Sequence, residues 1–456
     1  MAACYIARLE RAPVASTTIM PPTSSQELID RLRARTARLG VIGLGYVGLP
    51  LAVEFAKAGF ATVGFDVDED KVRRVLGGDP CGVDVSRADV EALTAGGRLS
   101  ATTDFTQLAG LDSVDICVPT PLRKTKDPDL SHIVAAVGEI ARHLHAGQLV
   151  VLESTTYPGT VEEVVRPMLE EGGLRGGKDF FLAFSPERID PGNREWTTAN
   201  IPKVVGGIDA VSTAVAQALY EQVVSTVVPV SSTRVAEMVK LLENTFRAVN
   251  IGLVNELALM SHELGIDVWE VIAAAGTKPF GFMPFYPGPG LGGHCIPIDP
   301  YYLSWKARQD GFESRFIELA GHINAGMPRF VVERVVEVLS VDRKLLRDAR
   351  VHLFGVAYKP GVGDVRESPA VDIVQLLLRG GAIVSYSDPH VPTVEQGDVT
   401  LEEVPWETAL EQGFDCGVIT TNHPEFDYEA IATRASRVVD TRNALKGFSG
   451  EHIYRL

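Results

Sequence analysis

The chain has 456 residues, of which 45% are hydrophobic and 22% are charged, a composition typical of a soluble globular protein with two or three domains. Its formal net charge of −16 argues against nucleic acid or an anionic membrane surface as the main partner. The five cysteines lie far apart and form no CxxC pair, so the sequence predicts neither a disulfide framework nor a metal site. We therefore expect a protein of the reducing cytoplasm.

Residues 1–37 are predicted to form an N-terminal extension. The beginning of this segment is rich in Ser, Thr and Pro and lacks the apolar core of a signal peptide. A short helix is expected over 24–36. No stretch of the chain approaches the ~20 apolar residues that a membrane-spanning helix needs.

The first predicted domain, 38–230, begins as a strand, a glycine turn, a helix and a second strand. The turn reads GLGYVG and covers 43–48, and the second strand ends at Asp66. Further strand-like runs at 114–121 and 148–156 alternate with helical segments, which predicts a doubly wound parallel sheet. Both runs end in polar residues that could line a cleft at the carboxyl edge of the sheet.

The glycine turn and Asp66 together predict an NAD site. Gly43, Gly45 and Gly48 let the backbone approach a pyrophosphate at a helix N-terminus. Asp66 follows a strand predicted over 61–65, where a carboxylate accepts hydrogen bonds from ribose hydroxyls and repels a 2′-phosphate, which favours NAD over NADP. The alternative is a turn whose glycines serve packing only. Lys71 is expected either to reach the cofactor or to be a solvated helix lysine.

The second predicted domain, 231–340, is helical. Apolar residues recur at helical spacing from 231 to 264 with no proline, which predicts one long helix that joins two sheet domains and forms a homodimer interface. Lys240, Asn244 and Arg247 share one face of this helix and suggest the wall of a cleft. The alternative for these three residues is a stripe that faces solvent.

The motif GPGLGGHCIPID, 288–299, places Cys295 in a stretch rich in glycine and proline. Glycine and proline at this density exclude a helix or strand interior. Cys295 has glycines and ionisable residues as neighbours rather than core residues, so we expect an accessible nucleophile with a lowered pKa. The alternative is an inert buried thiol.

The third predicted domain, 341–456, repeats the strand and helix rhythm. Strands are expected at 350–358, 382–389, 415–421 and 436–442, with a helix after Ser368. The complete fold prediction is therefore an α/β protein with two Rossmann-like, doubly wound parallel-sheet domains joined by a long central helix.

An NAD site and an exposed cysteine together predict one particular chemistry. A thiolate within reach of an aldehyde would trap it as a thiohemiacetal, and loss of a second hydride would give a thioester that water hydrolyses. The pair therefore predicts a four-electron oxidation of a primary alcohol to a carboxylic acid.

The motifs also resemble a known family. GLGYVGLPLA, ESTTYPGT, SPER, KLLENTFRAVNIGLVNE, GPGLGGHCIPIDPYYL and YKPGVGDVRESPA occur in the order seen in UDP-glucose/GDP-mannose dehydrogenases. Within that family the cysteine loop is most similar to that of UDP-N-acetylglucosamine 6-dehydrogenases, which serve surface polysaccharide synthesis, and next to that of UDP-N-acetylmannosamine dehydrogenases. The resemblance implies a UDP-sugar substrate, NAD as cofactor and uronic acid as product.

By position in these motifs, the resemblance implies six catalytic residues: Cys295, Lys240, Asn244, Asp299, Glu187 and Thr155. Lys240 and Asn244 match residues that hold the reacting oxygen, and the lysine stabilises a developing oxyanion. Asp299 is similar to the aspartate that orders this lysine and its water. Glu187 matches the glutamate that activates water for thioester hydrolysis, and Thr155 the threonine beside that water.

The resemblance also implies the binding residues. The cofactor contacts are Gly43, Gly45, Tyr46, Val47, Gly48, Asp66, Lys71, Thr120, Thr155 and Arg366. The substrate contacts are Glu187, Arg188, Lys240, Asn244, Arg247, Phe285, Tyr286, Gly290, Lys359 and Arg442. Among them, Lys359 matches a lysine that grips the nucleotide sugar, and Arg442 lies where the family contacts uridine.

Two departures from the family pattern point away from plain UDP-glucose. Pro191 stands where UDP-glucose enzymes have a second glutamate, and GTKPFG (276–281) stands where they have an arginine donated across the dimer. Lys278 is a candidate substitute for that arginine, and Arg247 a candidate contact for an N-acetyl group or a sugar hydroxyl.

Two other readings remain at this point. A two-electron β-hydroxyacid dehydrogenase would share the plan of a Rossmann domain and a long helix, and one NADH per substrate would identify it. An NAD-binding sensor without catalysis would leave Lys240, Asn244, Cys295 and Asp299 without a joint purpose.

Overall fold

The computed structural model describes residues 23–456, except 82–84, 124–126, 190–194, 294 and 397–398. These residues form two compact units. The N-terminal unit consists of the chain up to residue 243 together with 301–310, and the C-terminal unit consists of 244–300 and 311–456. Pro191, His294 and most of the predicted extension lie outside the described residues.

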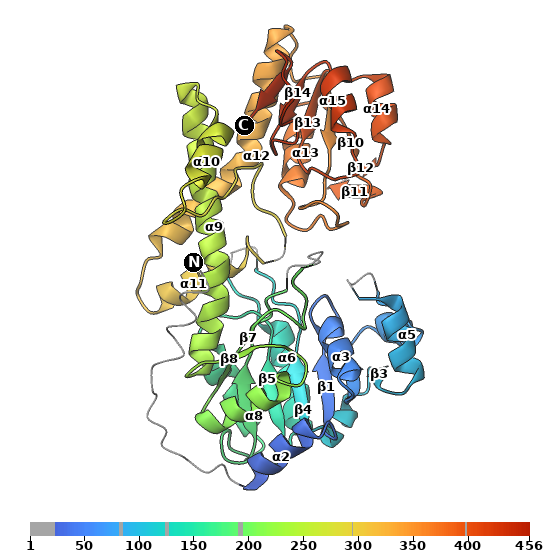
Figure 1. Ribbon diagram of the computed structural model, residues 1–456, viewed down its shortest axis with the longest axis vertical. Helices are drawn as coiled ribbons and strands as arrows, with labels where there is room; N and C mark the ends of the chain where they lie inside the picture. Colours follow the sequence, from blue (N-terminus) through green and yellow to red (C-terminus); the bar gives the residue numbers. More distant parts are fainter. Residues whose placement is uncertain (1–22, 82–84, 124–126, 190–194, 294, 397–398) are drawn as a thin grey trace. The chain divides into compact units, whose positions relative to one another are not determined.

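An eight-stranded sheet forms the centre of the N-terminal unit (Figure 1). Its strand order is β3-β2-β1-β4-β5-β6-β7-β8, and only β6 and β7 pair antiparallel. The order reverses between β1 and β4, which is where a doubly wound sheet binds its ligand. The strands are β1 (Arg38–Ile42), β2 (Ala61–Phe65), β3 (Leu99–Thr102), β4 (Ser113–Ile116), β5 (Leu149–Leu152), β6 (Phe181–Phe184), β7 (Lys203–Gly207) and β8 (Val227–Pro229).

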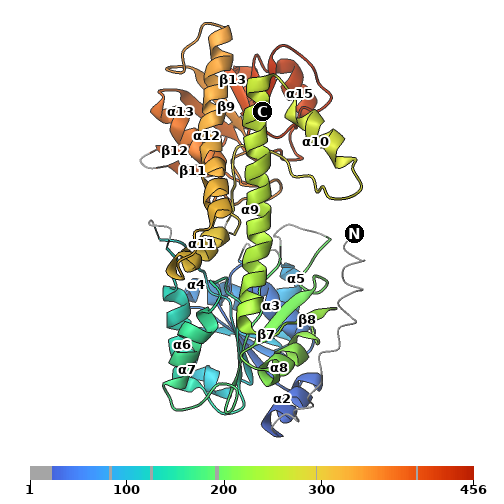
Figure 2. The same cartoon turned by 90° about the vertical axis from the view of Figure 1, so that its left-hand side faces the viewer.

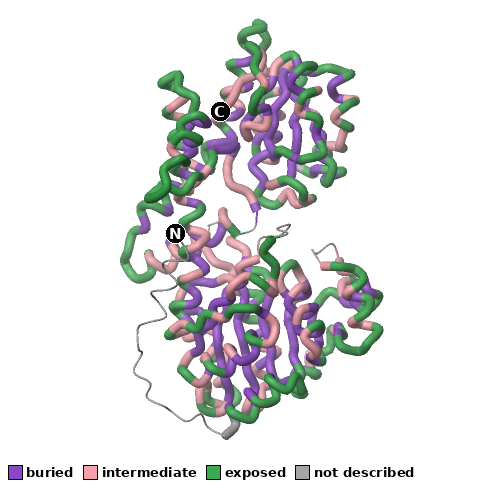
Figure 3. Tube along the Cα trace, viewed as in Figure 1, coloured by how far each residue is buried: buried purple, intermediate pink, exposed green. Residues whose placement is uncertain are grey.

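Helices cover both faces of this sheet. Successive side chains of a strand point to opposite faces, so Leu149 and Val151 of β5 join a core with α2, α3 and α8, whereas Val150 and Leu152 join one with α6 and α7. The strands are the most deeply buried part of the unit (Figure 3). The helices are α2 (Thr23–Arg33), α3 (Gly48–Lys57), α4 (Glu69–Leu76), α5 (Arg87–Ala95), η1 (Phe105–Gly110), α6 (Ser131–His143), η2 (Val161–Val165), α7 (Arg166–Glu170) and α8 (Ala210–Tyr220).

Helix α9 (Thr233–Leu264) is one unbroken helix of 32 residues (Figure 2). Its first part, up to residue 243, belongs to the N-terminal unit and the rest to the C-terminal unit. Three helices follow it in the chain, and the third continues through Pro328. They are α10 (Val268–Gly276), α11 (Asp299–Gln309) and α12 (Arg315–Val341).

A five-stranded parallel sheet forms the centre of the C-terminal unit. Its order is β10-β9-β13-β14-β15, which reverses between β9 and β13. Helices α12 and α13 pack on one face, and α14 and α15 on the other. The elements are β9 (Arg350–Phe354), α13 (Pro369–Arg379), β10 (Ile383–Ser387), α14 (Trp406–Gln412), β13 (Cys416–Ile419), α15 (Tyr428–Arg434), β14 (Val438–Asp440) and β15 (Ile453–Arg455), with a separate hairpin of β11 (Thr393–Gln396) and β12 (Val399–Glu402).

The predicted fold class is confirmed, with shorter strands than the sequence predicts. The runs at 114–121 and 148–156 are strands only over 113–116 and 149–152, because the residues that follow turn into loops at the carboxyl edge of the sheet. The limits proposed for the three domains stay predictions. Within the described ranges, no helix combines the length and apolar character that crossing a bilayer requires.

Candidate active site

The GLGYVG turn lies between β1 and α3, and two of its positions, Gly43 and Gly48, leave no room for a side chain. Gly43 has a φ of +94°, and a Cβ on it would lie 2.6 Å from the carbonyl oxygen of Cys117. A Cβ on Gly48 would lie 1.9 Å from the carbonyl oxygen of Gly43. By contrast, a Cβ on Gly45 would meet nothing within 4 Å. The turn is therefore tightly packed inside and open at Gly45, which fits the pyrophosphate of NAD at the N-terminus of α3.

Asp66 directly follows β2 and lies beside this turn. Its carboxylate accepts hydrogen bonds from the backbone N–H of Leu44 (2.9 Å) and of Asp68 (3.1 Å). Lys71 forms an ion pair with it at 2.8 Å. The position of Asp66 thus fits a contact with a ribose. Lys71 is bound to the carboxylate of Asp66 and is not simply a solvated lysine. Of the other two residues in the turn, Tyr46 is exposed and Val47 packs on the core.

The two predicted threonines follow neighbouring strands. Thr120 lies in the loop after β4 and Thr155 in the loop after β5, and these strands pair in parallel. The hydroxyl of Ser154 donates to the carbonyl oxygen of Val118 at 2.8 Å and holds the two loops together. The sheet therefore brings both threonines to the same edge as the glycine turn.

Lys240 and Glu187 contact each other in the N-terminal unit. The Nζ of Lys240 is buried and donates to the backbone carbonyl of Glu187 at 2.6 Å, so Lys240 does not face solvent. The carboxylate of Glu187 accepts the backbone N–H groups of Arg188 and Ile189, each at 2.7 Å. Burial pushes the pKa of Glu187 up, but Lys203, Lys240 and the two N–H groups more than offset this, so the pKa lies below its ordinary value.

Arg188 has partners inside the same unit. Its Nη2 donates to the carboxylate of Glu243 on α9 at 2.6 Å, and its Nη1 to the carbonyl of Pro202 at 2.6 Å. The guanidinium therefore ties the loop after β6 to α9. Its substrate contact stays a prediction.

Glu237, one turn before Lys240 on α9, is a residue that the sequence analysis missed. Its two carboxylate oxygens accept the N–H groups of Gly159 (2.6 Å) and Val161 (2.9 Å). Burial raises the pKa of Glu237 to about 8 in spite of these two donors. The bond pair fixes α9 against the turn that follows the Thr155 loop.

A second missed group surrounds Glu187. Lys203, Glu153, Asp115 and Tyr220 form a buried cluster of ionisable side chains in which Lys203 is 3.3 Å from the carboxylate of Glu187. These residues come from four separate elements or loops, so no spacing in the sequence connects them. The only available signal was the appearance of charged residues inside or beside otherwise apolar strands.

In the C-terminal unit, the glycine-rich loop before Cys295 is anchored by a chain of amides. The N–H of Gly288 donates to the side-chain oxygen of Asn255 at 3.0 Å. Asn255 in turn donates to Asn324 at 2.9 Å, and Asn324 donates to the carbonyl of Ala248 at 3.2 Å. Both asparagines are buried, so this chain of bonds connects the loop firmly to α9 and α12.

The same loop packs closely against the segment after β9. A Cβ on Gly292 would lie 2.7 Å from the Cβ of Tyr358, and the N–H of Gly293 donates to the carbonyl of Arg366 at 3.1 Å. Gly290 has a φ of +137°, which favours glycine. These contacts explain the glycine density that the sequence shows.

Cys295, Asn244 and Asp299 lie together in the C-terminal unit. Cys295 is exposed, and its carbonyl accepts the N–H groups of Ile298 (3.0 Å) and Asp299 (2.8 Å) as α11 begins. The side-chain amide of Asn244 donates to the carboxylate of Asp299 at 2.5 Å. Cys295 is therefore not a buried thiol, and its role as a nucleophile stays a prediction. Asn244 and Asp299 form one hydrogen-bonded pair.

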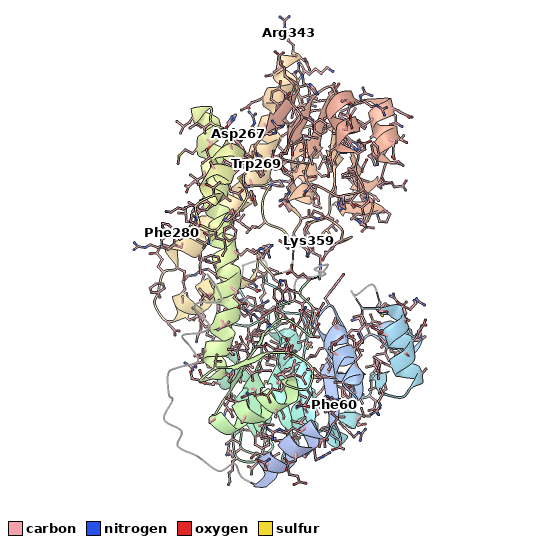
Figure 4. All side chains as sticks on the ribbon, viewed as in Figure 1. Phe60, Asp267, Trp269, Phe280, Arg343 and Lys359 are labelled. Carbon is pink, nitrogen blue, oxygen red and sulfur yellow. The ribbon has the colours of Figure 1, made fainter. Side chains whose placement is uncertain are left out.

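Other predicted substrate residues occupy the C-terminal unit at separate places. Phe285 packs edge-on against Phe246, and Tyr286 stacks on Trp269, which Figure 4 labels. The Nε of Arg442 donates to the carbonyl of Thr420 at 2.8 Å. The remaining ones are Arg247, which is exposed, Lys359, in the loop after β9, and Lys278, whose Nζ lies 5.0 Å from the ring centre of Phe280.

Arg366, predicted to contact the cofactor, forms a two-pronged ion pair with Asp364. Its Nε lies 3.0 Å and its Nη2 2.6 Å from the two carboxylate oxygens. The guanidinium is about half exposed. Its contact with NAD stays a prediction.

Among the described residues, His390, His423 and Glu425 have ligand atoms within 4.8 Å of one another. However, both ring nitrogens of His423 have protein partners. Nδ1 accepts the N–H of Gly361 at 3.3 Å, and Nε2 lies 3.0 Å from the carboxylate of Asp388. This histidine therefore serves to hold the loop that carries Lys359 and offers no free ligand to a metal ion.

The fold, the turn and Asp66 are those of an NAD-binding protein. The chain matches the three parts of one family: the UDP-glucose/GDP-mannose dehydrogenase family NAD binding domain over residues 37–224, its central domain over 234–326 and its UDP binding domain over 352–447. The chain belongs to this family. It is an oxidoreductase that uses NAD and acts on a UDP-sugar.

Individual relatives are similar over nearly the whole chain. A UDP-N-acetyl-D-mannosamine dehydrogenase of Pyrococcus horikoshii is 36% identical over 419 residues, which is 90% of this chain and 96% of the relative. A UDP-N-acetyl-D-glucosamine 6-dehydrogenase of Pseudomonas aeruginosa is 38% identical over 391 residues, 85% of this chain and 91% of the relative. A solved UDP-D-ManNAc dehydrogenase structure from Pyrococcus horikoshii has a TM-score of 0.83 at 34% identity, covering 92% of this chain and 98% of that chain.

Proposed function

We propose that the protein oxidises the C6 hydroxyl of UDP-N-acetylglucosamine to a carboxylate in two successive oxidations through Cys295. The observation that carries the proposal is the exposed thiol of Cys295 in a glycine loop that is packed on the Tyr358 segment and anchored by Asn255. A thiol placed at an accessible, rigidly held position has the properties of a covalent nucleophile.

The covalent route has a defined electron balance. Oxidation of the C6 alcohol gives an aldehyde, and the Cys295 sulfur adds to it to form a thiohemiacetal. A second oxidation gives a thioester, and water cleaves the carbon–sulfur bond to release the acid and the thiol. NAD bound at the glycine turn would be the oxidant: each oxidation would transfer one hydride, which carries both electrons, and release one proton, so two NADH would form for each acid.

We assign the oxygen chemistry to Lys240 and Asn244. The buried ammonium of Lys240 can stabilise negative charge that develops on the C6 oxygen. The amide of Asn244 is oriented by its bond to Asp299, which supports a donor role toward the same oxygen. Both residues would then act in the oxidations and in the hydrolysis.

We assign the hydrolytic proton transfer to Glu187. The pKa of its carboxyl is held below the ordinary value, so it is ionised at neutral pH and can accept a proton from water. Thr155, at the same edge of the sheet, is the proposed partner that positions this water.

The identity of the sugar rests on the relatives. The cysteine loop and the 38% identity to the Pseudomonas aeruginosa enzyme support UDP-N-acetylglucosamine. The second candidate is UDP-N-acetylmannosamine, because the Pyrococcus horikoshii enzyme of that name is similar over a larger share of the chain. Arg247 is the proposed contact to the N-acetyl group.

The test is a substrate panel. The enzyme is incubated with NAD and with UDP-glucose, UDP-GlcNAc, UDP-ManNAc, UDP-GalNAc or GDP-mannose, and NADH and product mass are recorded. We expect the highest kcat/KM for UDP-GlcNAc and two NADH for each uronic acid. A ratio of one NADH to one product would contradict the four-electron oxidation, and a preference for UDP-ManNAc would establish the second candidate.

We further propose a homodimer through α9 that works in the reducing cytoplasm. Large apolar side chains are exposed along α9 at helical spacing: Val235, Met238, Leu242, Phe246, Leu253, Leu257, Met260 and Leu264. Such a stripe is typical of a protein–protein interface. A reducing compartment would keep Cys295 in the reduced state that the proposed chemistry requires.

A further inference from the structure

Lys203 is a buried lysine that the proposed mechanism does not use. It begins β7 and is 4% exposed, and its ammonium lies among carboxyl groups from three other segments of the N-terminal unit. An unpaired ammonium at this depth would be strongly destabilising, so its partners decide what it does.

The partners form a chain of contacts. The Nζ of Lys203 lies 3.0 Å from Oε2 of Glu153 and 3.3 Å from Oε2 of Glu187. The hydroxyl of Tyr220 contacts the other oxygen of Glu153 and lies 2.7 Å from the carboxyl of Asp115. Asp115, Glu153 and Tyr220 are all fully buried.

The number of protons available to Tyr220 and its two carboxyl neighbours limits which of these groups can be charged. A tyrosine hydroxyl carries one proton, so it can donate to only one of its two carboxyl neighbours, and the other must supply a proton of its own. Burial raises the pKa of both carboxyl groups, that of Asp115 well above its ordinary value, whereas Lys203 at 3.0 Å opposes the rise at Glu153, so that proton lies on Asp115. Tyr220 then donates to an ionised Glu153.

The remaining charges are Glu153, Lys203 and Glu187, together with Lys240, whose ammonium bonds to the Glu187 backbone carbonyl and is unchanged in every variant below. Burial lowers the pKa of Lys203, but the two carboxylates more than offset this and leave it above its ordinary value, so the lysine stays a cation. It therefore does not relay protons. One cation is shared by two carboxylates, and one of these carboxylates is the residue to which we assign the hydrolytic step.

We propose that Lys203 is the positioning residue for Glu187: it keeps the Glu187 carboxylate ionised and oriented, while Glu153 and Tyr220 hold Lys203 in place. The proposal rests on the role assigned to Glu187 under the proposed function. Oε1 of Glu187 is fixed by two backbone N–H groups and Oε2 by Lys203, so the carboxylate has one defined orientation.

Removal of Lys203 should raise the pH at which Glu187 becomes protonated. Lys203→Gln leaves Glu187 buried and close to the negative charge of Glu153, so protonation of Glu187 becomes favourable at higher pH. The double variant Lys203→Gln/Glu153→Gln removes that repulsion together with the buried ion pair. Its protonation midpoint should lie between those of the wild type and of Lys203→Gln.

The experiment measures the fraction of the Cys295 peptide that carries an acyl adduct. Each enzyme turns over UDP-GlcNAc with NAD between pH 5 and 9, is quenched with acid, digested and analysed by mass spectrometry. The variants are Lys203→Gln, Lys203→Gln/Glu153→Gln and Lys203→Arg, with Lys57→Gln as the matched loss of a surface lysine that is paired with Glu54 and Asp89. Glu187→Gln is the reference for a missing base.

Protonated Glu187 cannot accept the proton from water, so adduct should accumulate on the acidic side. We expect the pH midpoint of adduct accumulation to be about one to three units higher in Lys203→Gln than in the wild type, with adduct present below that midpoint. We expect a smaller displacement in the double variant and wild-type behaviour in Lys203→Arg and Lys57→Gln. A merely structural role of Lys203 would lower activity without moving this midpoint.

Two results would overturn the proposal in different ways. If Glu187→Gln accumulates adduct at every pH but the double variant follows the wild-type profile, Lys203 does not position Glu187 and the proposed function stands. If Glu187→Gln accumulates no adduct, the role of Glu187 fails and this proposal fails with it. The double variant replaces both members of the Lys203–Glu153 pair and leaves neither charge buried alone. It can therefore be measured even if Lys203→Gln does not fold.

Discussion

Lys240 and Glu187 are joined by a hydrogen bond of 2.6 Å from the Lys240 ammonium to the Glu187 backbone carbonyl. This bond orients the ammonium next to the residue to which we assign the hydrolytic base. An ammonium carries three protons, so two remain for a substrate oxygen and a water. The geometry supports one residue that acts on the reacting oxygen in every step.

Lys240→Ala should therefore slow both the oxidations and the hydrolysis. Loss of one oxyanion donor lowers kcat by about 10²–10³-fold. Steady-state NADH formation and single-turnover acid release should fall together. Lys57→Ala is the control, because it removes a surface lysine. A Lys240→Ala variant with a normal burst of NADH but slow acid release would restrict Lys240 to hydrolysis.

Asp66→Ala should weaken NAD binding and relax the discrimination against NADP. Loss of a hydrogen bond to a charged group costs about 1.5–3 kcal/mol, or roughly tenfold or more in affinity. Titration with NADH and NADPH, followed by fluorescence, measures both affinities. Asp68→Ala is the matched control, since Asp68 is a neighbouring carboxylate that caps α4. A wild-type enzyme that already prefers NADP would show that Asp66 has been misinterpreted.

Glu237 gives a pH-dependent prediction for stability. Its pKa is raised to about 8 in the folded protein, so between about pH 4.5 and 8 the folded state binds a proton that the unfolded state has lost. This contribution to stability is full below the unfolded pKa and is lost as the pH rises to about 8. Glu237→Gln removes the titration, and the amide cannot accept both N–H groups.

The variant should therefore be less stable than the wild type by about 1–3 kcal/mol at pH 5, and the difference in Tm should narrow as the pH approaches 8. Thermal unfolding of both proteins across this range measures it. Glu91→Gln, an exposed carboxylate paired with Arg87 and not among the charges that act on Glu237, should show a constant difference. A difference in Tm that stays constant across this range would mean that Glu237 is ionised in the folded state throughout.

Local patterns in the sequence predicted the fold class, the use of NAD and the position of the glycine turn. The strand predicted over 61–65 is β2, and the helix predicted over 231–264 is α9. The spacing of apolar residues predicts both elements. Gly43 and Asp66 are recognisable because each directly follows a predicted strand, at the position where a dinucleotide site has its first glycine and its acidic residue. α12 was harder to predict, because Pro328 normally ends a helix and here lies inside one.

The charged interior could not be predicted for a different reason. Lys203 finds its partners 50 and 16 residues away, at Glu153 and Glu187, and only strand pairing brings these segments together. The same holds for Glu237, whose partners lie 78 and 76 residues earlier. Of these residues only Glu187 is marked in the sequence, by the SPER motif, and no spacing connects it to Lys203 or Glu153, or Glu237 to its partners.

Cys295→Ala should abolish formation of the acid while the affinities for NAD and the UDP-sugar stay near those of the wild type. The substitution removes the sulfur that carries the substrate and little binding surface, so kcat should fall by about 10³-fold or more. Calorimetric titration and product mass measure the two effects. Full turnover by this variant would exclude a covalent route.

The most direct test of the covalent route uses Glu187→Gln, which keeps the size of the side chain but cannot accept a proton. The variant is mixed with NAD and UDP-GlcNAc, NADH is followed in a stopped-flow instrument, and the protein is digested for mass spectrometry. We predict a burst of about two NADH per active site, followed by a stall with an acyl adduct on the Cys295 peptide. Steady turnover without an adduct, or the absence of any burst, would contradict the account.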